Sequence, residues 1–224
     1  MKKIFASLLI IIGIIIMLIP TFTNFYLKSK VKESVKDVIE MEPIELEKNL
    51  DNEAEFDYSI IEDIEVTSTL LNENKANKDL IIGQLTIPSI NLNIPVFKGI
   101  NNTNLLAGSA TMRENQIMGQ GNYPIAGHYS KNKNVLFGAL MDVKVGDIIK
   151  LTDKKNIYEY KVYEASVVPD TAVYYIDDEI SEIQEKPVIS LMTCYYSSKT
   201  GKRFFAMGEL NSSYPYEESL MYKK

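Results

Sequence analysis

Eight short stretches of strand-like composition follow one another after residue 80, and they limit the possible fold more than any other feature of the chain. Gly, Pro, Asn and Asp punctuate them at short intervals, and only residues 135–142 look helical. The stretches cover residues 82–87, 94–97, 122–128, 147–151, 157–168, 173–176, 188–194 and 203–210. Short strands without βαβ spacing favour a barrel or a sandwich, so we predict an all-β domain over residues 81–224.

An apolar run near the N-terminus predicts contact with a membrane. Lys2 and Lys3 precede residues 4–19, and the apolar character continues through Phe22, which gives about the 20 residues that a bilayer-spanning helix requires. A cleaved signal peptide is the alternative, but no clear small-x-small site follows the run. We therefore expect residues 1–27 to be an uncleaved, single-pass anchor. Lysines flank both ends of the run, so the positive-inside rule leaves the orientation open.

The segment between the anchor and the β-domain, residues 28–80, is polar and acidic and contains no glycine. It is predicted to be either a solvated stalk or an appendage that folds back on the domain as a lid. The apolar side chains of Tyr58, Ile60, Ile61 and Ile64 would anchor such an appendage.

The composition excludes several classes of protein and site. A net charge of −6 and the lack of a basic stripe argue against binding of nucleic acid. One cysteine cannot make an intramolecular disulfide framework or a cysteine-rich metal cluster. One histidine without a carboxylate set around it indicates no metal site, and we expect no cofactor.

Three rare side chains stand at the ends of predicted strands. Cys194 is the only cysteine, His128 the only histidine and Arg203 one of two arginines. If residues 188–194 and 203–210 pair as a hairpin, Cys194 faces Arg203 across its mouth. A thiolate is a good acyl-transfer nucleophile, an imidazole can protonate a departing amine, and a guanidinium can hold an oxyanion. Each residue alone is more simply structural, but together at strand ends they indicate a catalytic site.

The motifs around these residues resemble the sortases, the membrane-anchored cysteine transpeptidases of Gram-positive bacteria, and most closely class A. IGQLTIPSINLNIPVFKG is similar to the first two strands of that family, and MGQGNYPIAGH to the segment that leads to its catalytic histidine, here His128. SLMTC is similar to the TLxTC signature, which makes Cys194 the nucleophile, and Arg203 falls at the arginine of the family. The resemblance spans about residues 82–210. It implies a closed eight-stranded β-barrel with short helices, preceded by a transmembrane helix, with the catalytic domain outside the cell membrane.

The resemblance also implies the reaction. The enzyme would cleave an LPXTG-type sorting signal of a secreted protein between Thr and Gly and form a thioacyl intermediate on Cys194. His128 would act as general acid and then as base, and Arg203 would stabilise the oxyanion. The acyl group would pass to the amine of a lipid II-type peptidoglycan precursor. A neutral Cys–His pair and a thiolate–imidazolium pair are both compatible with the sequence.

The substrate groove implied by the resemblance involves five further residues: Ala126, Met192, Thr193, Val173 and Tyr175. The sequence departs from the family pattern at Ser190, where a threonine is usual. Glu114 is the only acid between residues 108 and 121, so the acidic cluster that binds calcium in some class A members is not expected.

Two other functions compete with this interpretation. Papain-like and cell-wall hydrolase cysteine peptidases usually place the cysteine before the histidine and at the start of a helix, whereas Cys194 follows His128 and ends a strand. A non-catalytic, anchored β-domain that binds a wall component is the second alternative. Cleavage of sorting-signal peptides that persisted after Cys194→Ala would exclude the nucleophile assignment.

Overall fold

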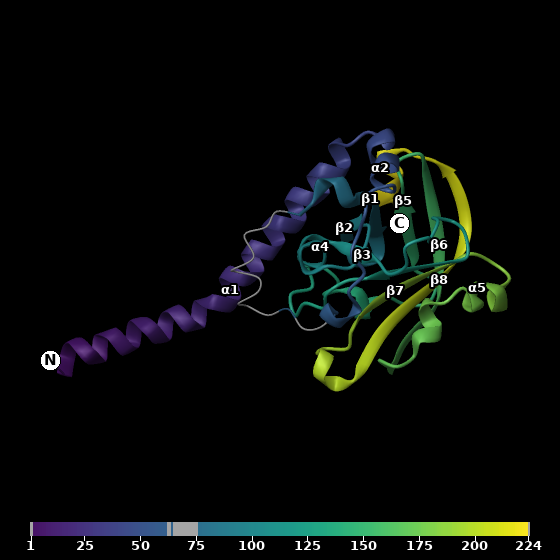
Figure 1. The fold of residues 1–224 in the computed structure, drawn as a ribbon. Helices are drawn as coiled ribbons and strands as arrows, with labels where there is room; N and C mark the ends of the chain where they lie inside the picture. The colour runs from purple at the N-terminus through teal and green to yellow at the C-terminus, as the bar shows by residue number, and fades with distance from the viewer. Residues whose placement is uncertain (1, 62–63, 65–75, 224) are drawn as a thin grey trace.

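A computed structural model describes residues 2–61, 64 and 76–223. Eight strands close into a barrel in the order β1-β2-β3-β4-β7-β8-β6-β5 (Figure 1). The strands are β1 (Ile81–Ile87), β2 (Leu92–Phe97), β3 (Ser109–Thr111), β4 (Asn122–Ala126), β5 (Ile148–Thr152), β6 (Asn156–Pro169), β7 (Val188–Cys194) and β8 (Lys202–Pro215). The closed, eight-stranded all-β barrel predicted from the sequence is therefore confirmed.

The helices lie outside the barrel, and most of them are short (Figure 1). The α-helices are α1 (Lys2–Glu40), α2 (Pro43–Asn49), α4 (Asn102–Ala107) and α5 (Glu179–Gln184). The 3₁₀ turns are η1 (Tyr58–Ile60), η2 (Lys78–Leu80), η3 (Pro88–Ile90), η4 (Leu140–Asp142), η5 (Val173–Ile176), η6 (Ser198–Thr200) and η7 (Glu218–Tyr222).

The strand pairing of the barrel is mixed. Most neighbours are antiparallel, but β2 pairs with β3 and β4 pairs with β7 in parallel. Parallel strands carry their C-terminal ends to the same edge of a sheet. The β4–β7 pair therefore brings the residues that follow both strands to one rim of the barrel.

Alternate residues of the strands divide between two apolar clusters, because successive side chains point to opposite faces of a sheet. Leu191 and Phe204 belong to the cluster that fills the barrel and draws on seven of its strands. Met192 and Phe205 belong to a second cluster on the outer face of β4, β7 and β8. The outer cluster forms the floor of the site described below.

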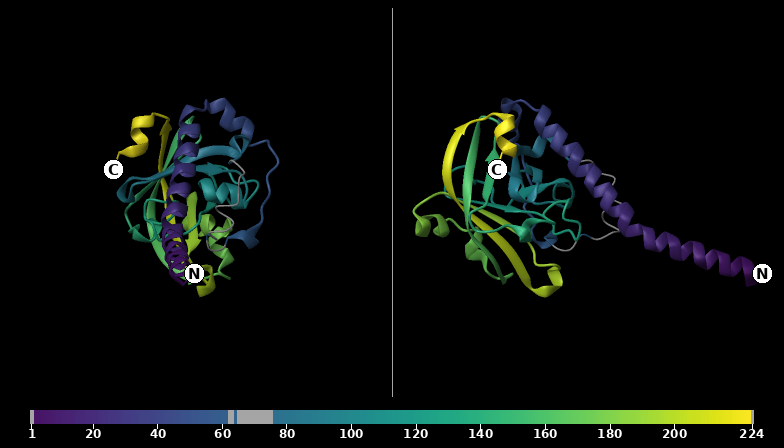
Figure 2. Two further views of the ribbon diagram at one scale, coloured as in Figure 1. Left: turned by 90° about the vertical axis from the view of Figure 1, so that its left-hand side faces the viewer. Right: turned by 180° about the vertical axis from the view of Figure 1, so that it is seen from behind.

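Helix α1 is one continuous element that leaves the barrel at its N-terminal half (Figure 2). In the described part of the chain it is the helix long and apolar enough to cross a membrane. Most of its large apolar side chains up to Phe22 are exposed, as is Phe25, and its buried face begins at Thr23 and continues through Leu27, Val31 and Val38. That spacing of about four residues is one face of a helix. Each fully buried Leu or Val contributes about 1.5–3 kcal/mol.

The segment after the anchor packs on the barrel rather than extending as a stalk. Lys154 Nζ donates to the carbonyls of Ile39, at 2.7 Å, and of Met41 at the C-terminal end of α1. Asn49 at the end of α2 is buried and donates to the carbonyls of Lys78, at 2.9 Å, and Ile81, at 2.8 Å. Residues 62–63 and 65–75 of the predicted 28–80 segment lie outside the described residues.

Two local predictions were wrong, and one strand was missed. Residues 173–176 form the turn η5 rather than a strand, because Tyr175 packs into the outer cluster as part of a one-turn helix. Residues 135–142 contain only the turn η4, and Leu136 interrupts any longer helix with a φ of 49°. Strand β3 was not predicted, since its three residues are too few to show alternation.

Candidate active site

The hairpin of β7 and β8 places the cysteine beside the arginine. The last register pair of these strands is Cys194 with Arg203, and the connection between them contains η6 and Gly201 in a left-handed conformation (φ 63°). A left-handed backbone conformation favours glycine, because glycine has no Cβ to clash with the neighbouring backbone. The predicted juxtaposition of Cys194 and Arg203 at the mouth of a hairpin is therefore confirmed.

The histidine reaches the same rim from the parallel neighbour of β7. Ala126 pairs with Met192, and the Gly127 amide donates to the Met192 carbonyl at 3.0 Å. His128 follows directly, so it stands level with Cys194, two residues beyond the paired positions. A Cβ on Gly127 would lie 2.5 Å from the ring of Phe137, which explains the glycine before the histidine. The structure thus brings together the three residues predicted to carry the chemistry.

A cavity of about 210 Å³ lies beside this rim, on the outer face of the barrel. Met192 and Val173 line it, together with Arg203. Ala126 and Tyr175 are buried in the cluster beneath and do not line it. Of the five residues predicted for the groove, Met192 and Val173 therefore line the cavity, whereas Ala126 and Tyr175 lie beneath it.

Thr193 and Tyr175 have supporting rather than lining positions. Alternation along β7 directs the fully buried Thr193 side chain to the opposite face from Cys194. The ring of Tyr175 stacks on Phe205 with centroids 4.8 Å apart, and its hydroxyl donates to Glu164 at 2.6 Å. Burial and the Glu164 carboxylate together raise the pKa of this phenol.

A peptide carbonyl from the N-terminal appendage lies between the cysteine and the arginine. The Cys194 thiol donates to the Ile61 carbonyl oxygen at 3.6 Å, and Arg203 Nη2 donates to the same oxygen at 3.5 Å. The Ile61 side chain is only 5% exposed and packs in the outer cluster. Cys194 is consequently 1% exposed. Ile61 therefore lies over Cys194, and the lid role of the appendage stays a prediction.

Two contacts before Ile61 fasten this segment to the barrel. Phe56 forms a parallel bridge with Ile100, and the Tyr58 hydroxyl donates to the Met112 carbonyl. Asp57 begins the turn η1 and accepts from the Ser59 amide at 2.9 Å. Nothing in the residue types of this segment indicated that Ile61 would present its carbonyl to the catalytic residues.

The second arginine of the chain has a structural role that sequence reasoning missed. Arg113 Nη2 pairs with Asp178 at 2.7 Å, and this hydrogen bond lowers the pKa of the Asp178 carboxyl. Asp178 also accepts from the Asn122 amide at 2.9 Å. The Asn122 side chain donates to the Tyr175 carbonyl and accepts from the Ser190 hydroxyl at 2.6 Å. The network joins β4 and β7 to the segment of η5 and α5 that walls the groove.

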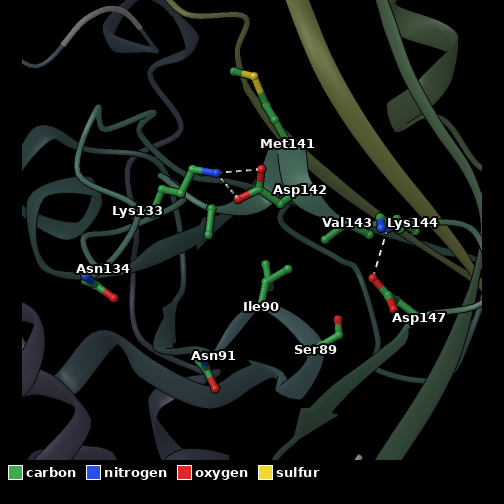
Figure 3. A pocket seen from close by; sticks show the side chains of 11 residues that line it. Ser89, Ile90, Asn91, Lys133, Asn134, Met141, Asp142, Val143, Lys144 and Asp147 are labelled. Carbon is green, nitrogen blue, oxygen red and sulfur yellow. Dashed lines mark hydrogen bonds and ion pairs between the residues drawn. The ribbon is translucent and has the colours of Figure 1, made fainter.

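A larger cavity, of about 740 Å³, lies away from the catalytic rim (Figure 3). Its walls include Asn91 and the ion pair between Lys133 and Asp142, at 2.6 Å. None of the three catalytic candidates lines it. Among the described residues, no three His, Cys, Asp or Glu side chains gather as a set of metal ligands would. Arg203, the register partner of Cys194, lines the smaller cavity instead.

The arrangement at the rim is suited to acyl transfer. A thiol can attack a carbonyl carbon whose oxygen is held by the guanidinium, as the Ile61 carbonyl is held now. An imidazole at the adjacent strand end can give and take the proton of an amine. All three groups stand at the ends of barrel strands, so a rigid sheet fixes their relative positions.

Comparison with known proteins agrees with this geometry. The sortase domain matches residues 85–211. Sortase A of Listeria monocytogenes is 38% identical over 214 residues, which are 95% of this chain and 93% of that protein. Sortase A of Bacillus anthracis is 34% identical over 209 residues, or 93% of each chain.

Solved structures give the same result. The crystal structure of Listeria monocytogenes sortase A has a TM-score of 0.59 and 42% identity, and the match covers 65% of this chain and 99% of that one. Sortase C-3 of Streptococcus pneumoniae, 22% identical, shares the fold with a TM-score of 0.60 over 83% of this chain and 92% of that one. The chain, with its sortase A-like sequence, therefore belongs to the sortase family of cysteine transpeptidases.

Proposed function

We propose that the enzyme cleaves LPXTG-type sorting signals between Thr and Gly and transfers the acyl group to the amine of a lipid II-type peptidoglycan precursor. The observation that carries this proposal is the Ile61 carbonyl. A peptide carbonyl of the chain itself lies within reach of both the Cys194 thiol and the Arg203 guanidinium. A substrate carbonyl at that position would be aligned for attack by sulfur and for stabilisation of its oxygen.

In the first half of the reaction, the Cys194 thiol passes its proton to His128, Sγ bonds to the carbonyl carbon of the substrate threonine, and the electron pair of the C=O bond moves to the oxygen. Arg203 donates to this oxyanion. His128 gives a proton to the glycine nitrogen, the C–N bond breaks, and the new glycine N-terminus leaves. The product is a thioester between the surface protein and Cys194.

In the second half, the precursor amine attacks the thioester carbon. His128 takes a proton from the attacking nitrogen, Arg203 again holds the oxyanion, and the C–S bond breaks to restore Cys194. The new amide bond joins the surface protein to the precursor. No oxidant, reductant or metal enters this balance.

The groove supports binding of the Leu-Pro part of the signal. Met192 and Val173 offer apolar surface beside the catalytic rim, over a floor that includes Ala126, Tyr175 and Phe205. Thr193 would contribute through its backbone rather than its hydroxyl, because its side chain faces the barrel interior. The sorting signal and Ile61 would compete for this place, so the appendage must move before a substrate binds.

The position of α1 supports a place at the cytoplasmic membrane. Residues 4–27 would hold the chain in the bilayer with the catalytic domain outside the cell. Secreted proteins would meet the enzyme as they leave the membrane. In this arrangement residues 1–27 are the anchor, residues 28–80 the appendage whose Ile61 lies at the site, and residues 81–224 the catalytic barrel.

A small panel of quenched sorting-signal peptides tests the proposal. The chain should cleave LPXTG peptides, and an added amine should divert the product from hydrolysis to transfer. Cys194→Ala should abolish both. If no peptide of the panel is cleaved, or if the Cys194→Ala protein still cleaves one, the assignment is wrong.

A further inference from the structure

A carboxylate lies on the outer face of the barrel, next to the apolar cluster that forms the floor of the groove. Glu164 of β6 is opposite Met207 of β8 in the register. Two residues further along, Ser166 is opposite Phe205. Met207 and Phe205 both belong to the outer cluster. Glu164 and Ser166 therefore lie on the same outer face, because residues paired across two strands share a face of the sheet. A carboxylate beside apolar side chains needs hydrogen-bond donors.

Two hydroxyl groups supply these donors. The Ser166 hydroxyl and the Tyr175 hydroxyl each donate to Oε1 of Glu164, both at 2.6 Å. Ser166 belongs to the same strand as Glu164, so its bond orients the carboxylate. Tyr175 belongs to η5, the turn that comes after β6, so its bond joins the turn to the sheet. A hydrogen bond to an ionised acceptor is roughly twice as strong as one between neutral groups.

Tyr175 is held at two further points. Its ring stacks on that of Phe205, with centroids 4.8 Å apart and an angle of 24° between the planes. Its carbonyl accepts from the Asn122 side chain at 3.0 Å. Contacts from β4, β6 and β8 thus converge on one residue of a four-residue turn.

The neighbours of Tyr175 in the turn reach the groove, although Tyr175 itself does not. Val173 and Ile176 line the cavity beside the catalytic rim, and so does Phe205, on which Tyr175 stacks. The position of this wall therefore depends on where Tyr175 is held. A change at its hydroxyl would act on a substrate only through Val173 and Ile176.

We propose that Glu164 and Tyr175 are positioning residues of the sorting-signal groove, and that their hydrogen bond sets where the η5 wall meets the signal. The proposal rests on the function proposed above and concerns binding of the signal rather than the chemical step. Cys194 and Arg203 are held by the pairing of β7 with β8, which does not involve η5. Loss of the hydrogen bond should therefore raise KM and leave kcat unchanged.

The test measures cleavage of a quenched LPXTG peptide by the full chain. Tyr175→Phe removes only the hydroxyl and should raise KM about tenfold, the effect of one hydrogen bond to a charged group. Glu164→Leu should do the same, whereas Glu164→Gln keeps an oxygen that accepts and should retain most of the binding. The double variant Tyr175→Phe/Glu164→Leu should be no weaker than either single variant, because both changes remove the same bond.

Tyr214→Phe is the matched control. The Tyr214 hydroxyl donates to Glu159 at 3.0 Å, which is also a bond between a phenol and a carboxylate, but neither residue lines the groove. This variant should leave KM unchanged. A KM that Tyr175→Phe does not alter, an equal rise in Tyr214→Phe, or additive effects in the double variant would each overturn the proposal.

Hydrogen exchange provides a readout that needs no turnover. The amides of Tyr175 and Asp177 donate to carbonyls within the turn, those of Ala172 and Tyr174. Both amides should exchange faster in Tyr175→Phe and in Glu164→Leu, but not in Tyr214→Phe, and unchanged exchange would overturn the proposal. Absence of peptide cleavage by the unaltered chain would instead refute the proposed function, and the exchange rates would still decide whether Glu164 holds the turn.

Discussion

The contact of Ile61 with the catalytic residues predicts that the appendage limits the activity of the enzyme. Ile61→Ala removes three carbon atoms from a side chain that is 5% exposed in the covered state. At about 0.8 kcal/mol per buried methylene, the covered state loses about 2 kcal/mol relative to the open one. The fraction of open molecules then rises by up to about thirtyfold, until the open state dominates.

Two measurements follow this fraction independently. At low substrate concentration, kcat/KM for a quenched sorting-signal peptide is proportional to the open fraction, because the peptide binds only the open enzyme. The rate of alkylation of Cys194 by iodoacetamide is proportional to it as well, and the chain has one cysteine, so mass spectrometry reports a single site. Both rates should rise by the same factor in Ile61→Ala.

The matched control is Ile44→Ala, the same substitution at an isoleucine that is 67% exposed on α2. It should leave both rates and the Tm unchanged. If Ile61→Ala alters neither kcat/KM nor the alkylation rate by more than about twofold, the Ile61 contact does not govern access to Cys194. If only alkylation accelerates, the segment shields the thiol without competing with the sorting signal.

Three further outcomes are expected. Arg203→Lys should lower kcat about 10²–10³-fold in the peptide assay, because a lysine cannot reproduce the planar donors at the oxyanion; an unchanged kcat would remove Arg203 from this role. The folded-state pKa of Asp178 is lowered by Arg113, so the ionised carboxylate adds stability that is present above its unfolded value of 3.8 and is lost as the pH falls through the folded pKa. In Arg113→Ala, acid titrations should therefore show a shallower loss of stability below that value, and an unaltered profile would contradict the coupling. Ser190→Ala leaves the buried Asn122 oxygen without this donor and should cost about 1–3 kcal/mol in calorimetric unfolding, whereas Ser190→Thr, which keeps the hydroxyl, should cost less.

The barrel and the catalytic rim could be predicted because their signals are local. Strand alternation and turn residues located seven of the eight strands, and a hairpin of residues 188–194 and 203–210 was enough to set Cys194 opposite Arg203. The position of His128 depends on the parallel pairing of β4 with β7, a long-range contact that no local pattern contains.

The remaining features depend on tertiary packing. Residues 173–176 have β-favouring side chains, but the stacking of Tyr175 on Phe205 and the Asn122 side chain at the Tyr175 carbonyl hold them as a turn. The Ile61 contact is made through a backbone oxygen, which every residue type possesses, so the identity of the side chain could not indicate it. Arg113 was visible as a rare residue, but its partner Asp178 lies 65 positions away in the sequence.

The continuous α1 helix restricts which substrates can reach the site. A helix rises about 1.5 Å per residue, so Leu27, which is buried on the barrel, lies about 8 Å along the axis from Phe22, at the end of the apolar run. Lys154 holds the C-terminal end of the same helix against the barrel. A flexible stalk would have let the catalytic domain range over tens of ångströms, whereas this attachment holds the rim of Cys194 and His128 close to the apolar half of α1, the half proposed above to lie in the membrane. Both proposed substrates, a secreted chain leaving the bilayer and a lipid-linked amine, are concentrated there. In the proposed arrangement, the packing of α1 on the barrel would therefore raise the chance of their meeting at the same site.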